Sequence, residues 1–225
     1  MIIILIGPPG SGKGTQSEML VSALSTLKEK NNYLENIGVE NICVGNILRE
    51  EIEKETQLGL KAKAIIERGD LLSDQDVFEI VKSRLNASSD VQFIILDGYP
   101  RTLEQAKLLE NYSTQPLKVI YFSLDRSHVI DRLNHRLTCK NCGKIYNLKT
   151  TPPKISHQCD DCGSDDLTQR ADDAKEAVLQ RLENYEEKTK PLIDFYARNG
   201  VLYNIDASQE KHKIHEEIVR IIQEK

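Results

Sequence analysis

The chain has 225 residues, of which 29% are charged and 39% hydrophobic, and its formal net charge at pH 7 is −5. This length supports one sizeable hydrophobic core in a globular protein. It has no apolar run near the roughly 18 residues that a membrane-spanning helix requires. An acidic chain is also not typical of general nucleic-acid binders. We therefore expect neither a membrane nor a nucleic-acid partner; a cytoplasmic location and a monomeric state are further expectations.

The first predicted element is the apolar run Ile2–Ile6, which is too short for a signal peptide and lacks a basic flank. Further short apolar runs follow along the chain: Asn41–Val44, Gln92–Leu96, Lys118–Leu124 and Val201–Ile205. Helical patterns separate these runs: Gln16–Lys30, Asp76–Asn86, Leu103–Glu110 and Ala174–Lys190. This alternation predicts an α/β fold with a parallel five-stranded sheet and helices on both faces.

Two stretches interrupt the alternation and are interpreted as insertions. The first, Gly45–Asp74, has helical patterns without a strong strand, and the second, Leu137–Asp172, holds four cysteines and Pro152-Pro153. The expected core then comprises residues 1–43, 75–136 and 173–225, with insertions at 44–74 and 137–172. The polar segment Asn31–Glu40 is predicted to be a surface connection.

A glycine-rich loop follows the first strand and opens a helix. Its residues are Gly7, Pro8, Pro9, Gly10, Ser11, Gly12, Lys13, Gly14 and Thr15. Glycines let backbone N–H groups turn toward an anion, and the helix N-terminus adds positive charge. The general phosphate-loop pattern has Ser or Thr directly after the lysine, whereas here the hydroxyl comes one place later. We interpret this loop as a phosphate-binding P-loop.

The apolar run Gln92–Leu96 ends in Asp97, the position from which a carboxylate holds Mg²⁺ near a P-loop. The turn Gly98-Tyr99-Pro100 then places Arg101 at the same edge of the sheet, where open parallel sheets bind ligands. Six of the eleven arginines lie beside such motifs, which indicates a local anion site in an acidic protein. They are Arg49, Arg101, Arg132, Arg136, Arg170 and Arg181.

Four of the five cysteines form two Cys-x-x-Cys pairs with sixteen residues between them. They are Cys139, Cys142, Cys159 and Cys162. This spacing is typical of a zinc ribbon, in which four thiolates complete a tetrahedral, structural zinc site. His157 is a weaker candidate ligand, and Cys43 is interpreted as a buried strand residue.

The chain resembles the adenylate kinase family over nearly its whole length. Pro9–Gln16 follows the loop of that family, and Asp97–Arg101 matches its Asp-Gly-Phe-Pro-Arg stretch, with Tyr99 for phenylalanine. The resemblance implies a P-loop core with an NMP-binding insertion at 44–74 and a zinc-containing lid at 137–172. It also implies reversible Mg²⁺-dependent phosphoryl transfer from ATP to AMP, giving ADP.

The resemblance assigns site residues to each substrate. For ATP it implies Gly10, Ser11, Gly12, Lys13, Gly14, Thr15, Arg132, Arg136, Ile145, Tyr146 and Gln209. For AMP it implies Val44, Arg49, Asp70, Leu71, Leu72, Gly98, Tyr99, Pro100, Arg101, Gln105, Arg170 and Arg181. For catalysis it implies Lys13, Asp97, Arg101, Arg136, Arg170 and Arg181, because transfer onto an anionic phosphate needs fixed cations and no general base.

The resemblance also implies that Asp172 and Asp173 latch the lid and orient its arginines. Asp173 with Glu176 also resembles a capping box for the helix that follows. If helical pitch held throughout, Arg170 and Arg181 would lie near one face.

Two positions depart from the family pattern. Val44 stands where the family has a threonine that contacts the AMP base, and Asn46 stands for an aspartate. These departures leave a UMP/CMP kinase or a GTP-using relative as alternatives. A P-loop ATPase or GTPase with a zinc insert remains a further alternative, but such proteins lack the Asp97–Arg101 stretch. A zinc-ribbon nucleic-acid-binding protein is the alternative outside this enzyme class, because the second insertion carries Lys140, Lys144, Lys149 and Lys154.

Overall fold

The computed structural model describes residues 1–30, 38–88 and 90–224, so most of the predicted surface connection 31–40 lies outside the described residues. Five parallel strands form the central sheet in the order β2-β3-β1-β4-β8. Their bounds are β1 Ile2–Ile6, β2 Val39–Cys43, β3 Phe93–Asp97, β4 Leu117–Ser123 and β8 Leu202–Asp206. The predicted parallel five-stranded sheet is therefore confirmed.

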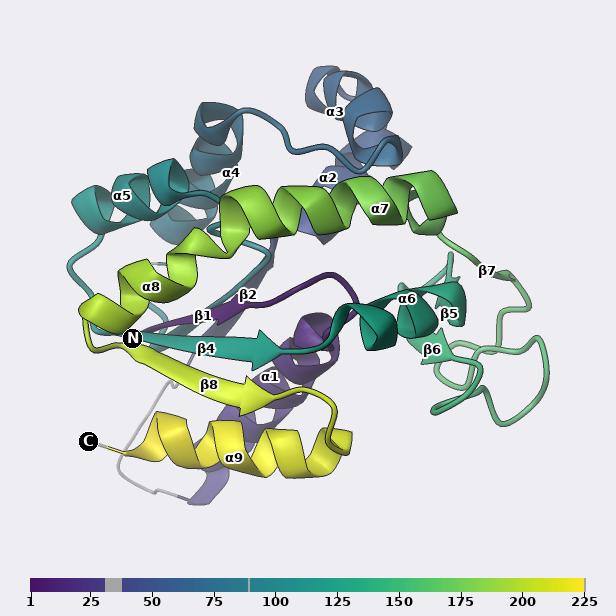
Figure 1. Cartoon of the computed structure of the whole chain (residues 1–225). Helices are drawn as coiled ribbons and strands as arrows, with labels where there is room; N and C mark the ends of the chain where they lie inside the picture. The colour runs from purple at the N-terminus through teal and green to yellow at the C-terminus, as the bar shows by residue number, and fades with distance from the viewer. Residues whose placement is uncertain (31–37, 89, 225) are drawn as a thin grey trace.

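Helices cover both faces of the sheet (Figure 1). The helices α1 (Lys13–Lys30) and α9 (Lys211–Gln223) pack on one face. The other face is covered by α4 (Asp74–Ala87), α5 (Leu103–Tyr112) and α8 (Pro191–Arg198).

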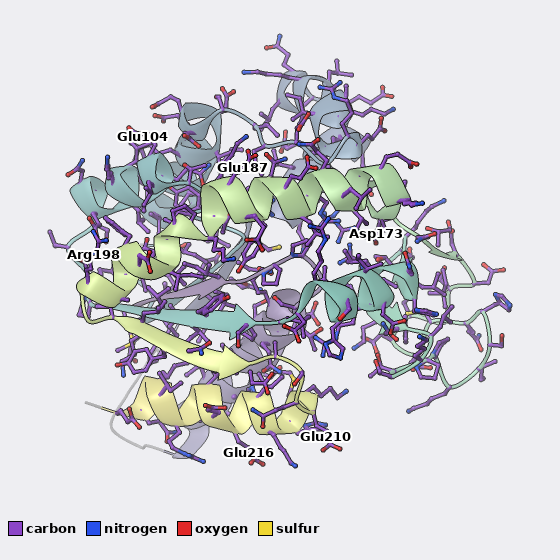
Figure 2. All side chains as sticks on the ribbon, in the orientation of Figure 1. Glu104, Asp173, Glu187, Arg198, Glu210 and Glu216 are labelled. Atoms are coloured by element: carbon purple, nitrogen blue, oxygen red, sulfur yellow. The ribbon has the colours of Figure 1, made fainter. Side chains whose placement is uncertain are left out.

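The side chains of β1 alternate between the two hydrophobic layers, which explains why this strand is apolar throughout. Ile3 and Leu5 pack against α1 and α9, whereas Ile2, Ile4 and Ile6 join the layer beneath α4, α5 and α8. A strand buried on both faces needs apolar residues at every position. Charged side chains stay outside this core, as Figure 2 shows for the exposed Glu104 and Glu216.

The first insertion forms a pair of helices, α2 (Val44–Glu53) and α3 (Gln57–Glu67). Thr56 caps α3 by accepting a hydrogen bond from the Gly59 backbone N–H at 3.0 Å. A Cβ atom on Gly59 would lie 2.0 Å from the Glu51 carbonyl oxygen, so only glycine permits this close packing of the two helices. The prediction of helices without a strand in this stretch is confirmed.

The second insertion follows α6 (Arg126–Asn134) and forms a small antiparallel sheet in the order β6-β5-β7. Its strands are β5 Arg136–Cys139, β6 Ile145–Asn147 and β7 Leu167–Thr168. Figure 1 shows this sheet beyond the carboxyl ends of the central strands. Cys139, Tyr146 and Cys159 form its small buried core.

The predicted helix Ala174–Lys190 divides into two elements, α7 (Lys175–Asn184) and the π-helical turn η2 (Tyr185–Thr189). The predicted capping box was wrong. The N-cap of α7 is Ala174, which makes no side-chain capping bond, and Asp173 lies in the preceding 3-10 turn η1 (Ala171–Asp173). The Asp173 carboxylate instead accepts hydrogen bonds from Arg136 and Arg181, because two opposite full charges attract each other more strongly than a carboxylate attracts a backbone N–H dipole. Among the described residues, no helix is long and apolar enough to cross a membrane.

Candidate functional site

A cleft of about 720 Å³ opens at the carboxyl ends of the central strands. All six arginines that the sequence placed beside motifs line it, and so does every residue predicted for ATP or for catalysis. The cleft is bounded by the P-loop on one side and by β6 of the second insertion on another. It therefore gathers positive charge from segments far apart in the sequence.

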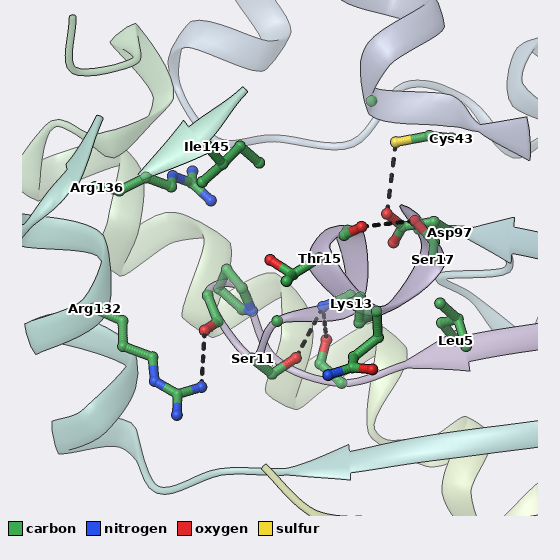
Figure 3. Close-up of a pocket in the computed structure, with 18 of the residues that line it drawn as sticks. Leu5, Ser11, Lys13, Thr15, Ser17, Cys43, Asp97, Arg132, Arg136 and Ile145 are labelled. Carbon is green, nitrogen blue, oxygen red and sulfur yellow. Dashed lines mark hydrogen bonds between the residues drawn. The ribbon is translucent and has the colours of Figure 1, made fainter. Parts of the chain in front are cut away.

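The P-loop connects β1 to α1 and surrounds the Lys13 ammonium group (Figure 3). Lys13 Nζ donates hydrogen bonds to the carbonyl oxygens of Gly7 and Pro8, at 2.9 and 2.8 Å, and to Ser11 Oγ at 3.2 Å. Burial lowers the pKa of Lys13 to about 7, Asp97 opposes this shift, and Arg101 reinforces it. A cation held in this way gains from any phosphate that replaces the lost hydration.

Asp97 ends β3 and faces the P-loop, with only 7% of its surface exposed. Cys43, at the end of the neighbouring β2, lies opposite it in register and donates its thiol to Asp97 Oδ2 at 3.6 Å. Burial and the Asp97 carboxylate raise the pKa of the Cys43 thiol to about 11, so the thiol stays a donor. The sequence indicated a buried cysteine, whereas the structure shows a half-buried one that contacts the predicted Mg²⁺-holding carboxylate.

Three arginines, Arg136, Arg170 and Arg181, converge on Asp172 and Asp173 where the second insertion returns to the core. Arg170 binds Asp172 through two hydrogen bonds of 2.9 and 2.8 Å, and Arg181 reaches the Asp172 carbonyl at 2.8 Å and Asp173 Oδ1 at 3.0 Å. Burial alone would raise the pKa of Asp172, but Arg181 and Arg170 outweigh it and hold the pKa well below its usual range. Arg170 lies outside α7, so helical pitch does not bring Arg170 and Arg181 together; they share the Asp172 carboxylate, whose Oδ2 lies 2.8 Å from Arg170 Nη2 and 3.1 Å from Arg181 Nη1.

A second, smaller cavity of about 80 Å³ adjoins the cleft beneath α2. Arg49, Arg101, Arg170 and Arg181 line both cavities. Among the other residues predicted for AMP, the second cavity is lined by Val44, Asp70, Leu71, Leu72, Gly98 and Gln105. Pro100 lines the main cleft instead.

Gln105 is buried at 2% exposure and organises the turn that carries Arg101. Its Oε1 accepts from the Arg101 backbone N–H at 2.8 Å, and its Nε2 donates to Asp74 Oδ1 at 2.9 Å. A side-chain amide can donate twice and accept twice, so contact with a base is compatible with these bonds. Tyr99 lines neither cavity; it is buried, and its hydroxyl donates to the Gln105 carbonyl at 3.0 Å.

Sequence reasoning missed two residues of the π-helical region that support the site. Asn184 Nδ2 donates to the Gly69 carbonyl at 3.1 Å, next to the predicted AMP-binding Asp70, and Thr189 Oγ1 donates to the Arg101 carbonyl at 2.9 Å. A π-turn inserts an extra residue into a helix and re-aims its side chains, often at functional sites. No sequence motif predicts this π-helical turn.

The four predicted metal ligands meet in the second insertion, with all sulfur atoms within 4.8 Å of one another. The Sγ atoms of Cys139 and Cys162 are 3.6 Å apart, and those of Cys142 and Cys159 are 3.5 Å apart. Tetrahedral zinc with Zn–S bonds of ~2.3 Å places sulfur atoms roughly 3.8 Å apart. The residues therefore fit a tetrahedral metal ion, and His157 is not part of the group.

The two cysteine pairs lie in matching turns, which further supports a metal centre. The backbone N–H groups of Gly143 and Gly163 donate to the carbonyls of Cys139 and Cys159, each at 2.9 Å. Both glycines have positive φ, at +76° and +74°, which glycine adopts without strain.

The P-loop on β1, the carboxylate ending β3 and the arginine-lined double cavity define a nucleotide-binding P-loop kinase. The adenylate kinase family model matches residues 5–201, and the chain belongs to this family. It is 40% identical over 226 residues to the adenylate kinase of Thermosipho melanesiensis, covering 99% of both chains. It is 38% identical over 227 residues to that of Archaeoglobus fulgidus, covering 99% of this chain and 98% of the relative. Kinase activity on nucleotides in nucleotide biosynthesis follows from this membership.

Proposed function

We propose that this enzyme transfers the terminal phosphoryl group of ATP to AMP, reversibly, giving two molecules of ADP. One observation carries the proposal: Arg101, Arg170 and Arg181 line both the cleft at the P-loop and the smaller cavity beside it. Two nucleotides bound in these cavities would meet with their phosphates at the shared guanidinium groups. This arrangement suits transfer between two anions and not hydrolysis of one.

The residues have distinct parts in this reaction. Lys13 and the P-loop backbone bind the outer phosphates of ATP, and Arg49 binds the phosphate of AMP. Arg101, Arg136, Arg170 and Arg181 stabilise the charge that spreads over the transferring group. The acceptor oxygen is already anionic, so no side chain has to remove a proton. Mg²⁺, when bound with ATP near Asp97 and Thr15, supplies further charge neutralisation.

The smaller cavity supports AMP as the acceptor. Val44 and Leu72 give it apolar walls, and Gln105 offers both a donor and an acceptor to a base edge. Val44 has no hydroxyl, and Arg49 donates to Asn46 Oδ1, a neutral partner, where the family has an aspartate. Because Val44 and Asn46 replace the family's threonine and aspartate, a UMP/CMP kinase stays the second candidate.

Three of the four lysines that suggested the nucleic-acid-binding alternative are paired with carboxylates, which argues against that alternative. Lys140 and Lys144 pair with Asp166 and Asp161 at 3.5 and 3.0 Å, and Lys149 pairs with Asp131. Paired lysines offer little net charge to a phosphate backbone, which is the dominant attraction in such binding.

We further propose that the metal is a structural Zn²⁺ and that the chain divides into a core (1–43, 75–136 and 173–225), an NMP-binding insertion (44–74) and a lid (137–172). Four thiolates leave no coordination position for water, so the ion holds the lid together. The cytoplasmic location and the monomeric state remain predictions.

A coupled assay tests the proposed reaction. Purified enzyme with ATP and Mg²⁺ is offered AMP, CMP, UMP or GMP, and the specificity constants are compared. We expect AMP to give the highest value. A preference for a pyrimidine monophosphate would move the assignment to the UMP/CMP kinase, and ATP hydrolysis without an acceptor would contradict the transfer reaction.

A further inference from the structure

The three residues of β6 connect three parts of the molecule. Ile145 and Tyr146 line the nucleotide cleft, and Asn147 Nδ2 donates to the Arg132 carbonyl at 3.1 Å. Arg132 in turn donates to the carbonyl oxygens of Ala207 at 2.7 Å and Gly10 at 3.5 Å. The strand therefore reaches from the second insertion to the P-loop through two side chains.

Tyr146 adds the metal centre to this connection. It is 3% exposed and packs with Cys139 and Cys159 in the small core of the insertion. Its hydroxyl oxygen accepts a hydrogen bond from the Asp160 backbone N–H at 2.7 Å and lies 3.4 Å from Cys159 Sγ. With the oxygen accepting from Asp160, the hydroxyl proton is free to point at the sulfur. A thiolate sulfur is an acceptor, so this bond suits a metal-bound cysteine.

We propose that Tyr146 is a positioning residue for the metal ligand Cys159 and that β6 couples occupation of the metal site to the affinity for ATP. Metal binding fixes Cys159, the Tyr146 hydroxyl fixes β6 against it, and Asn147 fixes the Arg132 backbone beside the P-loop. The proposal rests on the proposed zinc and ATP sites. It adds a specific route between them.

Such coupling must be reciprocal: if zinc tightens ATP binding, ATP tightens zinc binding by the same factor. Reciprocity gives a readout that does not depend on turnover. The same measurement distinguishes coupling between the metal and ATP sites from a metal that only keeps the lid folded. A metal with only a folding role would require neither the Tyr146 hydroxyl nor the Asn147 amide.

The first experiment compares zinc affinity in wild type, Tyr146→Phe and Tyr203→Phe, by competition with a chromogenic zinc chelator. Phenylalanine keeps the packing and removes the hydroxyl. Loss of an outer-shell partner typically weakens metal binding roughly 10–100-fold. We expect that loss in Tyr146→Phe. The control, Tyr203→Phe, lies on β8 against Lys118 and should bind zinc as wild type does.

The second experiment repeats the competition with a non-hydrolysable ATP analogue present. We expect the analogue to tighten zinc binding by about fivefold or more in wild type, the lower end of measured couplings. Asn147→Ala should keep its zinc affinity and lose this response. The route is overturned if Tyr146→Phe binds zinc as tightly as wild type, or if the analogue leaves wild-type zinc affinity unchanged. A wild-type chain that binds no zinc would overturn the proposed metal as well.

Discussion

Arg136 and Asp173 are joined by two hydrogen bonds, from Nε to Oδ2 at 2.7 Å and from Nη2 to Oδ1 at 2.5 Å. Arg136 begins β5, the first strand of the small antiparallel sheet, and Asp173 follows β7, the last one, so this ion pair joins the two ends of the second insertion across 37 positions of sequence. Figure 2 shows Asp173 near the start of α7, between that helix and α6. The Asp173 side chain is 0% exposed.

Asp173→Ala is therefore expected to destabilise the protein strongly. It leaves the guanidinium groups of Arg136 and Arg181, with side chains 12% and 16% exposed, without a shared partner. Breaking a buried ion pair typically costs ~3–5 kcal/mol. Denaturant unfolding should show this loss, whereas Glu50→Ala, which removes the exposed pair with Lys54, should change stability by less than about 1 kcal/mol. Equal effects would contradict the role of Asp173.

Arg101→Ala should reduce turnover far more than stability. Arg101 lines both cavities, and its Nε donates to the Gly98 carbonyl at 3.0 Å, which aims the guanidinium into the site. Losing one preorganised charge contact to a transition state costs ~3–4 kcal/mol, or on the order of a hundredfold to a thousandfold in kcat. Steady-state kinetics and thermal unfolding measure the two effects. Near-normal turnover would remove Arg101 from the reaction.

Cys159→Ser should abolish tight metal binding and lower the melting temperature. The sulfur of Cys159 is one of four within 4.8 Å of one another, and a hydroxyl is a far poorer zinc ligand. Elemental analysis should find about one zinc per wild-type chain and much less in the variant. Cys43→Ser, remote from the cluster, serves as the control and should keep its metal. Unchanged metal content and melting temperature in Cys159→Ser would contradict the metal site.

ATP binding at pH 8 should take up close to one proton. Burial lowers the pKa of Lys13 to about 7, so most Lys13 side chains are neutral at pH 8. Phosphates beside the amine favour its charged form and raise this pKa. The phosphates themselves are ionised at pH 8, because their second pKa is about 6.

Because ATP binding takes up a proton at pH values above the pKa of Lys13, ATP affinity should fall as pH rises above about 7. Calorimetry in two buffers with different ionisation heats measures the uptake. Lys13→Arg stays charged at pH 8 and should show no proton uptake from this site. Equal uptake by the variant would assign the proton to another group.

Val44→Thr should sharpen selectivity for AMP. Val44 lines the smaller cavity and is 4% exposed, so a hydroxyl there could reach a base edge. One net hydrogen bond is worth ~0.5–1.5 kcal/mol, or roughly a factor of two to ten in discrimination. Specificity constants for AMP, CMP and UMP in both proteins test this. If the substitution leaves all three unchanged, Val44 serves packing alone.

The sequence by itself determined the features that reside in contiguous residues. Ile2–Ile6 is apolar at every position because β1 is buried on both faces, and this pattern alone predicts a central strand. The P-loop and the two Cys-x-x-Cys pairs are equally local, because their function depends on backbone turns at fixed spacing. The sequence alone therefore predicts Lys13 as a phosphate-binding residue and the four cysteines as ligands of one metal ion.

Only the tertiary structure decided which partners the polar side chains choose. Asp173 resembled a helix cap in sequence, yet two arginines, one of them 37 residues away, compete for its carboxylate and prevail. Thr189 contacts Arg101 from the π-helical turn, and Tyr146 meets Cys159, 13 residues further along the chain, within the folded second insertion. These contacts depend on burial by segments distant in the sequence, which strengthens charge pairs and penalises unpaired polar groups. No local pattern encodes which distant segments will cover a given polar side chain.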